Sequence, residues 1–293
     1  MDEVFLGRYR VDERLGHGGM ATIWRCTDLV SMRQVAVKLL SAKADSARAL
    51  LEGEAMAAVR HPNVVRLLDF GLESGGRPCL VMELVHGEVL RARLDREGFV
   101  PWNRAFGWGA AVLNGLSAIH DADFMHRDVK PANIMVPHRP EDAVKLIDLG
   151  IVTPRVPSEP RLTQTGMVIG TPGYMAPELL MGGTPGVAAD IYSLGMVLWE
   201  AIGGIHPVKA GLDQAIAKLS FRPKLATLPT GAPPLPDAAR LLLTRMLRAP
   251  LEERLDNARE CAALMRSVIL GHRQTQPEAQ AWSDTVEIDV DFR

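Results

Sequence analysis

The segment HRDVKPAN, residues 126–133, gathers a carboxylate, two cations and an amide around a proline. Asp128 could act as a general base, and Asn133 offers an amide oxygen five residues later. A second carboxylate, Asp148, follows fifteen residues after Asn133, behind the strand-like stretch VKLIDLG. Mg²⁺ accepts amide and carboxylate oxygens together with substrate phosphates and water. The spacing therefore indicates metal-assisted chemistry on a phosphate, whereas a polar turn with an Asx cap would explain only the first segment.

A lysine interrupts the apolar run VAVKLL, in which Lys38 lies amid residues suited to burial. A buried ammonium group needs an anionic partner, because leaving it unpaired is costly. The helical register counted back from His61 favours Glu52 over Glu54 as that partner. The interval between Lys38 and Glu52 is short, and an exposed lysine on an edge strand is the alternative.

The stretch RLGHGGMATIW, residues 14–24, has three glycines within four residues. Glycine clusters usually form plain turns, because glycine readily adopts φ > 0. A loop whose backbone N–H groups cover phosphates is the other interpretation, and the glycines alone do not decide between them.

Several elements must position these residues. Strands are expected at 9–15, 21–28, 34–40, 64–70 and 78–84, and a helix at 46–60. Long helices are expected at 103–121, 188–203 and 238–247, and the proline-rich stretch 223–236 reads as a loop. The order predicts an α+β fold with two lobes, a small antiparallel sheet with one helix and a larger, mostly helical lobe.

The expected organisation is an N-terminal extension at 1–8, a domain at 9–270 and a C-terminal tail at 271–293. The small lobe would span about 9–85 and the large lobe about 86–270. From His272 onward the tail carries five acids against two arginines, and we expect it to be mobile. Its stretch TVEIDVDF alternates apolar and polar residues, so it could instead add as a strand to a partner's sheet.

The composition excludes several classes of function. With 47% hydrophobic and 23% charged residues and a net charge of −2, the chain lacks the basic character of a nucleic-acid-binding protein. It contains neither a membrane-spanning apolar run nor a signal-peptide pattern. Its three cysteines are widely separated, which suits a reducing, cytoplasmic location.

Taken together, these segments resemble the bacterial eukaryotic-like (Hanks-type) serine/threonine protein kinases. The matching segments, in the order of that family, are LGHGGMATIW, VAVK, Glu52, HPNVV, LVMELVHG, HRDVKPAN, IDLG, GTPGYMAPE, DIYSLGMVLWE and Arg254 in EERL. They cover roughly residues 9 to 270.

The resemblance implies ATP as phosphoryl donor with Mg²⁺, or Mn²⁺ in its place, and assigns roles that are known for the family. Asp128 would be the catalytic base, Lys130 would steady the transferred group, Lys38 would hold the α- and β-phosphates, and Glu52 would orient Lys38. The metal ligands would be Asn133 and Asp148. The residues around the nucleotide would be Leu15, Gly16, Gly18, Gly19, Ile23, Ala36, Lys38, Met82, Glu83, Val85 and Met135.

Protein serines and threonines are the implied acceptors, because Lys130 and Thr171 match that branch of the family. Thr163 and Thr165 lie where the family places autophosphorylation, with Arg127 as the receiver of the phosphate charge; two solvated loop threonines are the alternative. The resemblance also gives structural roles to Glu178 and Arg254, as an ion pair, and to Asp190, as a brace for the catalytic loop.

The sequence departs from the family at Ala21, which replaces a loop glycine, and at Leu149, which replaces a phenylalanine. Neither change removes a catalytic group. A pseudokinase scaffold that binds partner proteins is the main alternative function, and a small-molecule phosphotransferase is another. A transient pair of kinase domains and a partner bound by the tail are further expectations about assembly.

Overall fold

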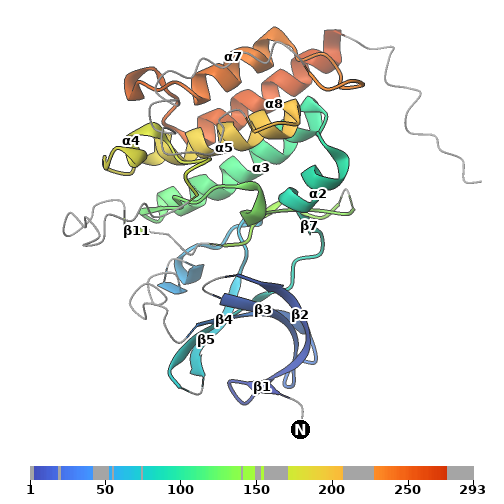
Figure 1. The fold of residues 1–293 in the computed structure, drawn as a ribbon, viewed down its shortest axis with the longest axis vertical. Coiled ribbons are helices and arrows are strands. Elements are labelled where there is room, and N and C mark those ends of the chain that lie inside the picture. Colours follow the sequence, from blue (N-terminus) through green and yellow to red (C-terminus); the bar gives the residue numbers. More distant parts are fainter. Residues whose placement is uncertain are drawn as a thin grey trace, which may run out of the picture.

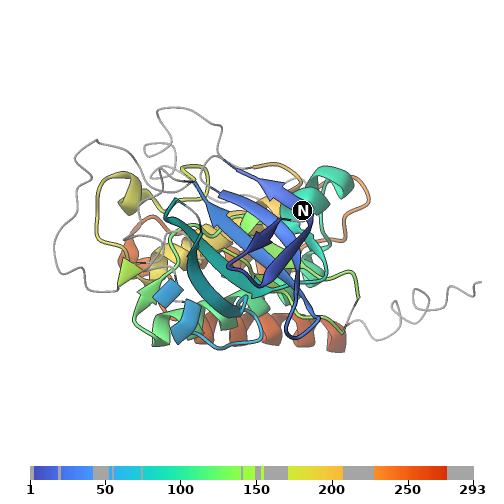
Figure 2. The same ribbon diagram turned by 90° about the horizontal axis from the view of Figure 1, so that it is seen from below.

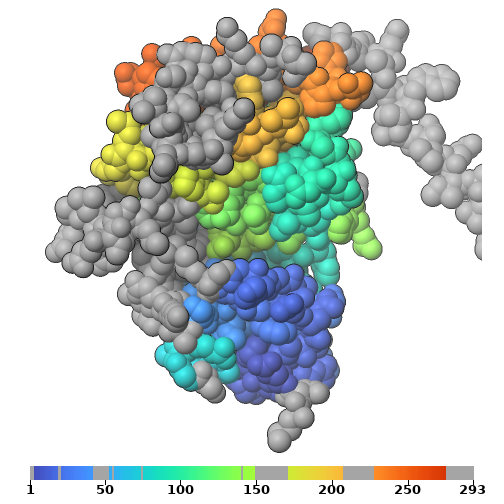
Figure 3. Space-filling view, viewed as in Figure 1, coloured from blue at the N-terminus to red at the C-terminus, as the bar shows by residue number. Residues whose placement is uncertain are grey.

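The computed structural model describes residues 3–18, 21–41, 53–54, 56–73, 75–139, 141–148, 153–154, 171–206 and 228–275. Within these residues the chain forms a lobe of strands and a lobe of helices, as Figure 1 shows. The two lobes are also distinct masses in the space-filling view, the small one blue and the large one green to orange (Figure 3). The predicted α+β class with two lobes is confirmed.

The small lobe is a six-stranded antiparallel sheet in the order β1-β2-β3-β4-β6-β5. Seen from below, its curved strands lie over the helices of the large lobe (Figure 2). Its strands are β1 (Val4–Phe5), β2 (Tyr9–His17), β3 (Ala21–Asp28), β4 (Gln34–Leu40), β5 (Leu67–Glu73) and β6 (Arg77–Glu83).

The two faces of this sheet pack in different environments, because successive side chains of a strand point to opposite sides. Val35, Val37 and Leu39 of β4 join the core of the outer face. Ala36 and Leu40 belong instead to the core that continues into the large lobe. Lys38 lies between Ala36 and Leu40, two residues from each, so its side chain is on the same inner face, towards the large lobe.

The large lobe is built around α3 (Trp102–Asp121), α5 (Val187–Gly203) and α8 (Ala258–Thr275). Its other helices are α2 (Leu90–Glu97), η1 (Pro131–Asn133), α4 (Pro177–Leu180), α7 (Asp237–Met246) and η2 (Leu251–Glu253). Its short strands are β7 (Glu88–Val89), β8 (Phe124–Met125), β9 (Ile134–Val136), β10 (Lys145–Leu146) and β11 (Thr153–Pro154). No helix within the described ranges is both long and apolar enough to span a lipid bilayer.

Residues 61–66 attach the small lobe to the large one. The Asn63 side chain donates to the Val144 carbonyl at 2.8 Å, and the Asn63 carbonyl accepts from the Leu146 N–H at 2.9 Å. Helix α3 passes so close that a Cβ on Gly115 would lie 2.8 Å from the Asn63 carbonyl oxygen. Only glycine allows this approach, which fixes the segment against α3 and β10.

Regular structure extends beyond the predicted 9–270 domain at both ends. The expected N-terminal extension contains β1, which pairs with β2, and Phe5 is buried in the outer core of the sheet. Helix α8 continues five residues into the expected tail, where the His272 ring packs edge-on against Trp102 at 5.0 Å. The strand expected at 64–70 begins at Leu67 instead, because residues 61–66 bond to the large lobe. Most of the helix expected at 46–60 lies outside the described residues.

Arg254 and Glu178 form the ion pair expected in the large lobe. Arg254 donates to both Glu178 carboxylate oxygens, at 2.7 and 3.0 Å, and its side chain is fully buried. The same guanidinium also donates to the Arg248, Ala188 and Ala249 carbonyls. The pair joins α4 to the end of η2, and the bond from Arg254 to the Ala188 carbonyl adds α5.

Replacing Arg254 by lysine keeps the charge but removes the planar set of donors. We expect Arg254→Lys to lower the free energy of unfolding by about 1–3 kcal/mol, since several buried acceptors lose their partners. Urea denaturation measures this change. Arg248→Lys is the matched control, because its pair with Glu253 is exposed, and it should change stability by less than about 0.5 kcal/mol. Equal effects of the two substitutions would contradict the prediction.

Candidate active site

Asp190, in the first turn of α5, fixes the backbone that precedes Asp128. Its buried carboxylate accepts hydrogen bonds from the N–H groups of His126 at 3.0 Å and Arg127 at 2.8 Å. It also bonds His120 Nε2 at 2.8 Å. Burial alone would raise the pKa of Asp190, but the bond to His120 and the backbone donor outweigh it and hold the pKa below its usual value.

The backbone held by Asp190 has an unusual conformation. Arg127 has φ 64°, in the left-handed region that non-glycine residues rarely adopt. Such a conformation persists only where the surroundings impose it, and the bonds to Asp190 do so here. Burial lowers the pKa of the Arg127 guanidinium, and its Nε is buried without a hydrogen-bond partner in the described part of the chain.

Asp128 lies at the centre of a set of donors. One carboxylate oxygen accepts from the Thr171 N–H at 3.2 Å and from the Thr171 hydroxyl at 3.0 Å. The other lies 2.6 Å from Lys130 Nζ and 3.2 Å from Asn133 Nδ2. Lys130 also donates to the Thr171 hydroxyl at 3.0 Å. The arrangement holds Asp128 as an oriented acceptor, the state that a general base requires.

Lys38 and Asp148 form a second group that connects the lobes. Lys38 Nζ donates to an Asp148 oxygen at 2.9 Å; the lysine side chain is 11% exposed and the aspartate 38%. The Asp148 carboxylate is therefore accessible to solvent. The groups around Asp148 and Asp128 are linked through the backbone, because the Ile147 N–H donates to the Asn133 carbonyl at 3.0 Å.

The donor chemistry at Asn133 fits a hard cation. Its amide nitrogen donates to the Asp128 carbonyl at 2.9 Å and to the Asp128 carboxylate, so the amide oxygen faces away from these bonds. This oxygen and the partly exposed carboxylate of Asp148 are ligands that Mg²⁺ accepts, with phosphate oxygens and water completing its shell. The residues present therefore fit the metal that the sequence predicts.

The residues expected around the adenine come from five strands and the segment after β6. Ile23 pairs with Lys38 across β3 and β4, and Ala36 pairs with Met82 across β4 and β6. Leu15 lies at an irregularity of β2 and is 46% exposed. The others are Met135 in β9, Glu83 at the end of β6, and Val85.

The backbone of Glu83 is only partly available to a purine. Its N–H donates to the Arg66 carbonyl at 3.0 Å, so only its carbonyl group could bond a purine edge. Its carboxylate accepts from Lys145 at 2.7 Å, an ion pair that joins β6 of the small lobe to β10 of the large lobe.

Part of the expected site lies outside the described residues: Gly19, Glu52, Thr163 and Thr165. Their assignments stay predictions, including the pairing of Lys38 with Glu52. The glycine loop is described only at its ends. Gly16 belongs to β2, and the Gly18 N–H donates to the Ala21 carbonyl at 2.9 Å.

The sequence analysis missed several groups near this site. His120 bonds Asp190 but lies on a helix face with no motif around it. Glu200 bonds Tyr174 and Arg91, and Lys145 bonds Glu83. Glu200 follows Asp190 by ten residues in the same apolar helix, so its charge is a signal in the sequence that could have identified it.

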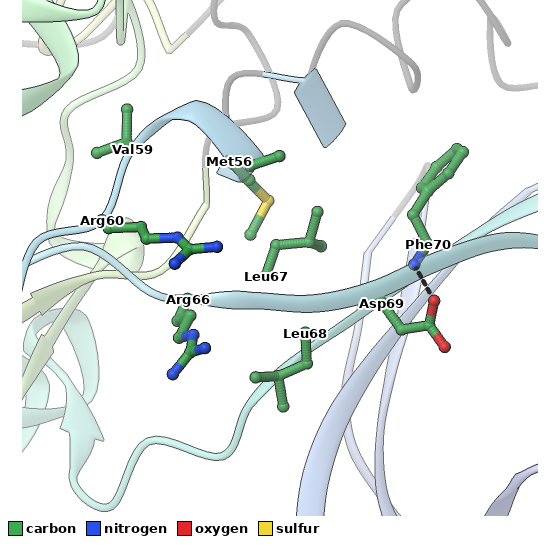
Figure 4. Close-up of a pocket in the computed structure, with 9 residues that line it drawn as sticks. Met56, Val59, Arg60, Arg66, Leu67, Leu68, Asp69 and Phe70 are labelled. Carbon is green, nitrogen blue, oxygen red and sulfur yellow. Dashed lines mark hydrogen bonds between the residues drawn. The ribbon is translucent and has the colours of Figure 1, made fainter.

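A cavity of about 250 Å³ lies apart from these groups, between residues 56–60 and strand β5 with the residue before it (Figure 4). Met56, Val59 and Leu67 are among its apolar lining residues, and Arg60 and Arg66 lie together at one side. None of its lining residues belongs to the predicted nucleotide or catalytic set.

Comparison with known proteins identifies the family to which the chain belongs. The family described as "Protein kinase domain" matches residues 9–266. A serine/threonine-protein kinase PknA of Corynebacterium glutamicum is 33% identical over 290 residues, which are 96% of this chain and 60% of that protein. PknA of Mycobacterium tuberculosis H37Ra is 36% identical over 237 residues, 78% of this chain and 54% of that protein. The serine/threonine-protein kinase pkn2 of Myxococcus xanthus is 37% identical over 270 residues.

This chain spans little more than half the length of the two PknA proteins. The family match nevertheless covers most of the chain, including every motif from the glycine loop to Arg254. The chain therefore belongs to the protein kinase family and is of the bacterial eukaryotic-like serine/threonine type.

Proposed function

We propose that this chain transfers the γ-phosphoryl group of ATP to serine or threonine hydroxyls of proteins. The observation that carries the proposal is the convergence of Lys130, Asn133 and Thr171 on the carboxylate of Asp128. A second supporting observation is the Lys38–Asp148 pair, which joins β4 of the small lobe to the segment after β10 of the large lobe. Phosphoryl transfer needs mainly position and countercharge, and this set of groups supplies both.

In the proposed mechanism the acceptor hydroxyl takes a place beside Asp128 and gives its proton to that carboxylate as its oxygen attacks the γ-phosphorus in line. The bond from the γ-phosphorus to the β–γ bridging oxygen breaks, and ADP leaves. Lys130 balances the charge on the transferred group, and Lys38 orients the α- and β-phosphates. Asn133 and Asp148 would hold Mg²⁺, which would supply countercharge to the phosphates. These oxygen ligands suit Mg²⁺ and Mn²⁺ alike, and Mg²⁺ is the cation proposed here.

We propose further that phosphorylation of Thr163 and Thr165 activates the enzyme. Each phosphate adds about −1.5 to −2 charges at neutral pH. The supporting observation is the half-buried Arg127, which precedes Asp128 in sequence and whose Nε is buried without a hydrogen-bond partner among the described residues. A phosphate that pairs with Arg127 would offset the cost of partly burying this cation.

The test is ATP- and Mg²⁺-dependent phosphorylation of an added protein substrate by the full chain, with the modified sites mapped by mass spectrometry. We expect phosphate on serines and threonines of the substrate and on Thr163 and Thr165. Lys38→Met should lose both signals, because Lys38 orients the phosphates. Persistent phosphorylation in Lys38→Met would point to a contaminating kinase and contradict the proposal.

The activation step is tested separately with a double Thr163→Ala and Thr165→Ala variant. Lower activity towards the added substrate is expected, whereas full activity would contradict this step and leave phosphoryl transfer itself standing. The scaffold alternative has no observation in its favour, because Lys38, Asp128, Asn133 and Asp148 are all present.

A further inference from the structure

The cavity beside β5 combines an apolar floor with two arginines. Met56, Val59 and Leu67 supply apolar surface, and the first two are almost fully buried. Arg60 and Arg66 are exposed, and Figure 4 shows both at the same side of the hollow. Neither guanidinium forms a hydrogen bond or an ion pair with another residue in the part of the chain that the structure describes. The two cations are therefore available to an anionic group that also brings apolar side chains.

Other charges near the cavity do not cancel those of the arginines. Asp69 is the one acidic residue of the lining; its carboxylate accepts from the Tyr9 hydroxyl at 2.7 Å, and Figure 4 shows it away from the arginines. Glu83 accepts from the Arg66 N–H at 2.9 Å, but its carboxylate is paired with Lys145 at 2.7 Å. The lining residues together keep a positive charge, which favours an anionic occupant.

The size of the cavity selects the side chains of a peptide. Its volume of about 250 Å³ lies below the roughly 300 Å³ at which small-molecule sites begin. A nucleotide is therefore too large for it, whereas one or two apolar side chains of an extended peptide fill it. An aromatic side chain buries the most apolar surface for a single residue.

The C-terminal tail contains a segment of this kind. In TVEIDVDF, residues 285–292, four apolar residues alternate with Glu287, Asp289 and Asp291, and no cation is present. Alternate side chains of an extended chain point to opposite sides, so one side of this segment is apolar and the other acidic. With Phe292 in the hollow, the neighbouring carboxylates point to the rim, where the arginines lie. Carboxylates and guanidinium groups form charge-assisted hydrogen bonds there.

The tail is long enough to reach the cavity from the end of α8. His272 of α8 packs against Trp102 in the first turn of α3, and Gly115 of α3 touches Asn63. The rise of α3 between these two contacts is about 20 Å. The two arginines lie three residues either side of Asn63, at most about 11 Å further. With the contacts themselves the path measures about 45 Å, whereas residues 276–292 span up to about 55 Å when extended.

Tethering favours this segment over a separate partner. Exposed ion pairs contribute little each, so a free peptide with the same contacts binds weakly. A segment joined to its site by a flexible linker has an effective concentration of the order of millimolar. Weak contacts are then enough for the tail to occupy the cavity.

We infer that residues 285–292 bind the cavity beside β5 in the same chain. Phe292 occupies the apolar hollow, and Asp289 and Asp291 pair with the two arginines at its rim. The tail starts in the large lobe and ends on the small lobe, so it forms an additional connection between the lobes. The inference goes beyond the proposed function and does not depend on it, because it concerns a contact within the chain and not phosphoryl transfer.

Disulfide trapping in the full chain tests the contact directly. Leu68→Cys places a thiol at a lining residue that is 45% exposed, and Val290→Cys places one on the apolar side of the tail. The three native cysteines are buried and do not compete. Mild oxidation should join the two new thiols within one chain, as mass spectrometry of the digest shows. Leu72→Cys with Val290→Cys is the matched control, because Leu72 is exposed on the same strand outside the cavity, and it should react at least about tenfold more slowly.

Hydrogen exchange measures the bound tail without new cysteines. The amides of residues 286–292 should exchange about tenfold more slowly in the wild type than in Arg60→Asp, Arg66→Asp. The tail variant Asp289→Arg, Asp291→Arg should lose the same protection and leaves both lobes unaltered, so it serves if the first variant does not fold. Combining the two pairs of substitutions exchanges the charges and should restore protection.

The control makes the same change of charge away from the cavity. Arg33→Asp, Arg139→Asp replaces two exposed arginines outside the lining and should keep the wild-type protection. Tail amides that exchange in the wild type as fast as in an unfolded peptide overturn the inference, as does protection that survives in the tail variant. A disulfide that forms between two chains also overturns it, because the occupant is then the tail of a second copy. Loss of kinase activity with the protection intact refutes only the proposed function.

Discussion

Asp128→Asn is expected to lower kcat by about 10²- to 10⁴-fold, the usual contribution of a positioned general base. Asparagine matches the shape of aspartate but cannot take the proton of the attacking hydroxyl. It also loses the ion pair with Lys130 at 2.6 Å, so the lysine no longer has a fixed place beside the transferred group. Steady-state phosphorylation of a protein substrate measures the change.

Nucleotide affinity should change little in this variant, because the proposed metal ligands Asn133 and Asp148 remain. Calorimetric titration with ATP and Mg²⁺ checks this point. Asp123→Asn is the matched control: it removes the same charge from an exposed residue five positions earlier, at a positive φ that asparagine also accepts. The assignment of the base is refuted if Asp128→Asn retains more than about a tenth of the wild-type kcat.

Asp190→Asn should damage both stability and activity. The carboxylate accepts from two backbone N–H groups and contacts His120, so an amide in its place turns one side into a donor that faces another donor. A buried group left without its partner costs about 2–4 kcal/mol of unfolding free energy. The strained φ of Arg127 loses its support as well, and the resulting displacement of Asp128 should lower kcat by about 100-fold.

The loss of stability should depend on pH. The folded-state pKa of Asp190 lies below its ordinary value, so the ionised group stabilises the fold at neutral pH and loses this effect as the pH falls below about 4. Wild type and Asp190→Asn should therefore converge in stability on acidification. Asp256→Asn, at an exposed position, is the control and should follow the wild type at every pH. A constant difference between wild type and Asp190→Asn down to pH 3 would contradict this account.

Several elements could be predicted from local patterns, and others could not. The hairpin of β2 and β3, the strand β4 and the helices α3, α5 and α7 all lie close to their predicted ranges, because their apolar residues follow one clear period. Helix α2 was missed because only Leu90 and Leu94 of its eight residues are buried and the others are mostly charged. Helix α8 was missed although Cys261, Ala262 and Met265 are fully buried, because its other positions obscure the pattern.

The sequence by itself determined the family, the two-lobed α+β class and the identity of the candidate catalytic groups, because these depend on residue types at fixed intervals. The tertiary structure alone decided which groups meet: Lys130 and Thr171 at Asp128, His120 at Asp190, and Arg91 with Tyr174 at Glu200. Arg91 and Glu200 are 109 residues apart, and no local period relates them. Their contact arises from the packing of whole helices.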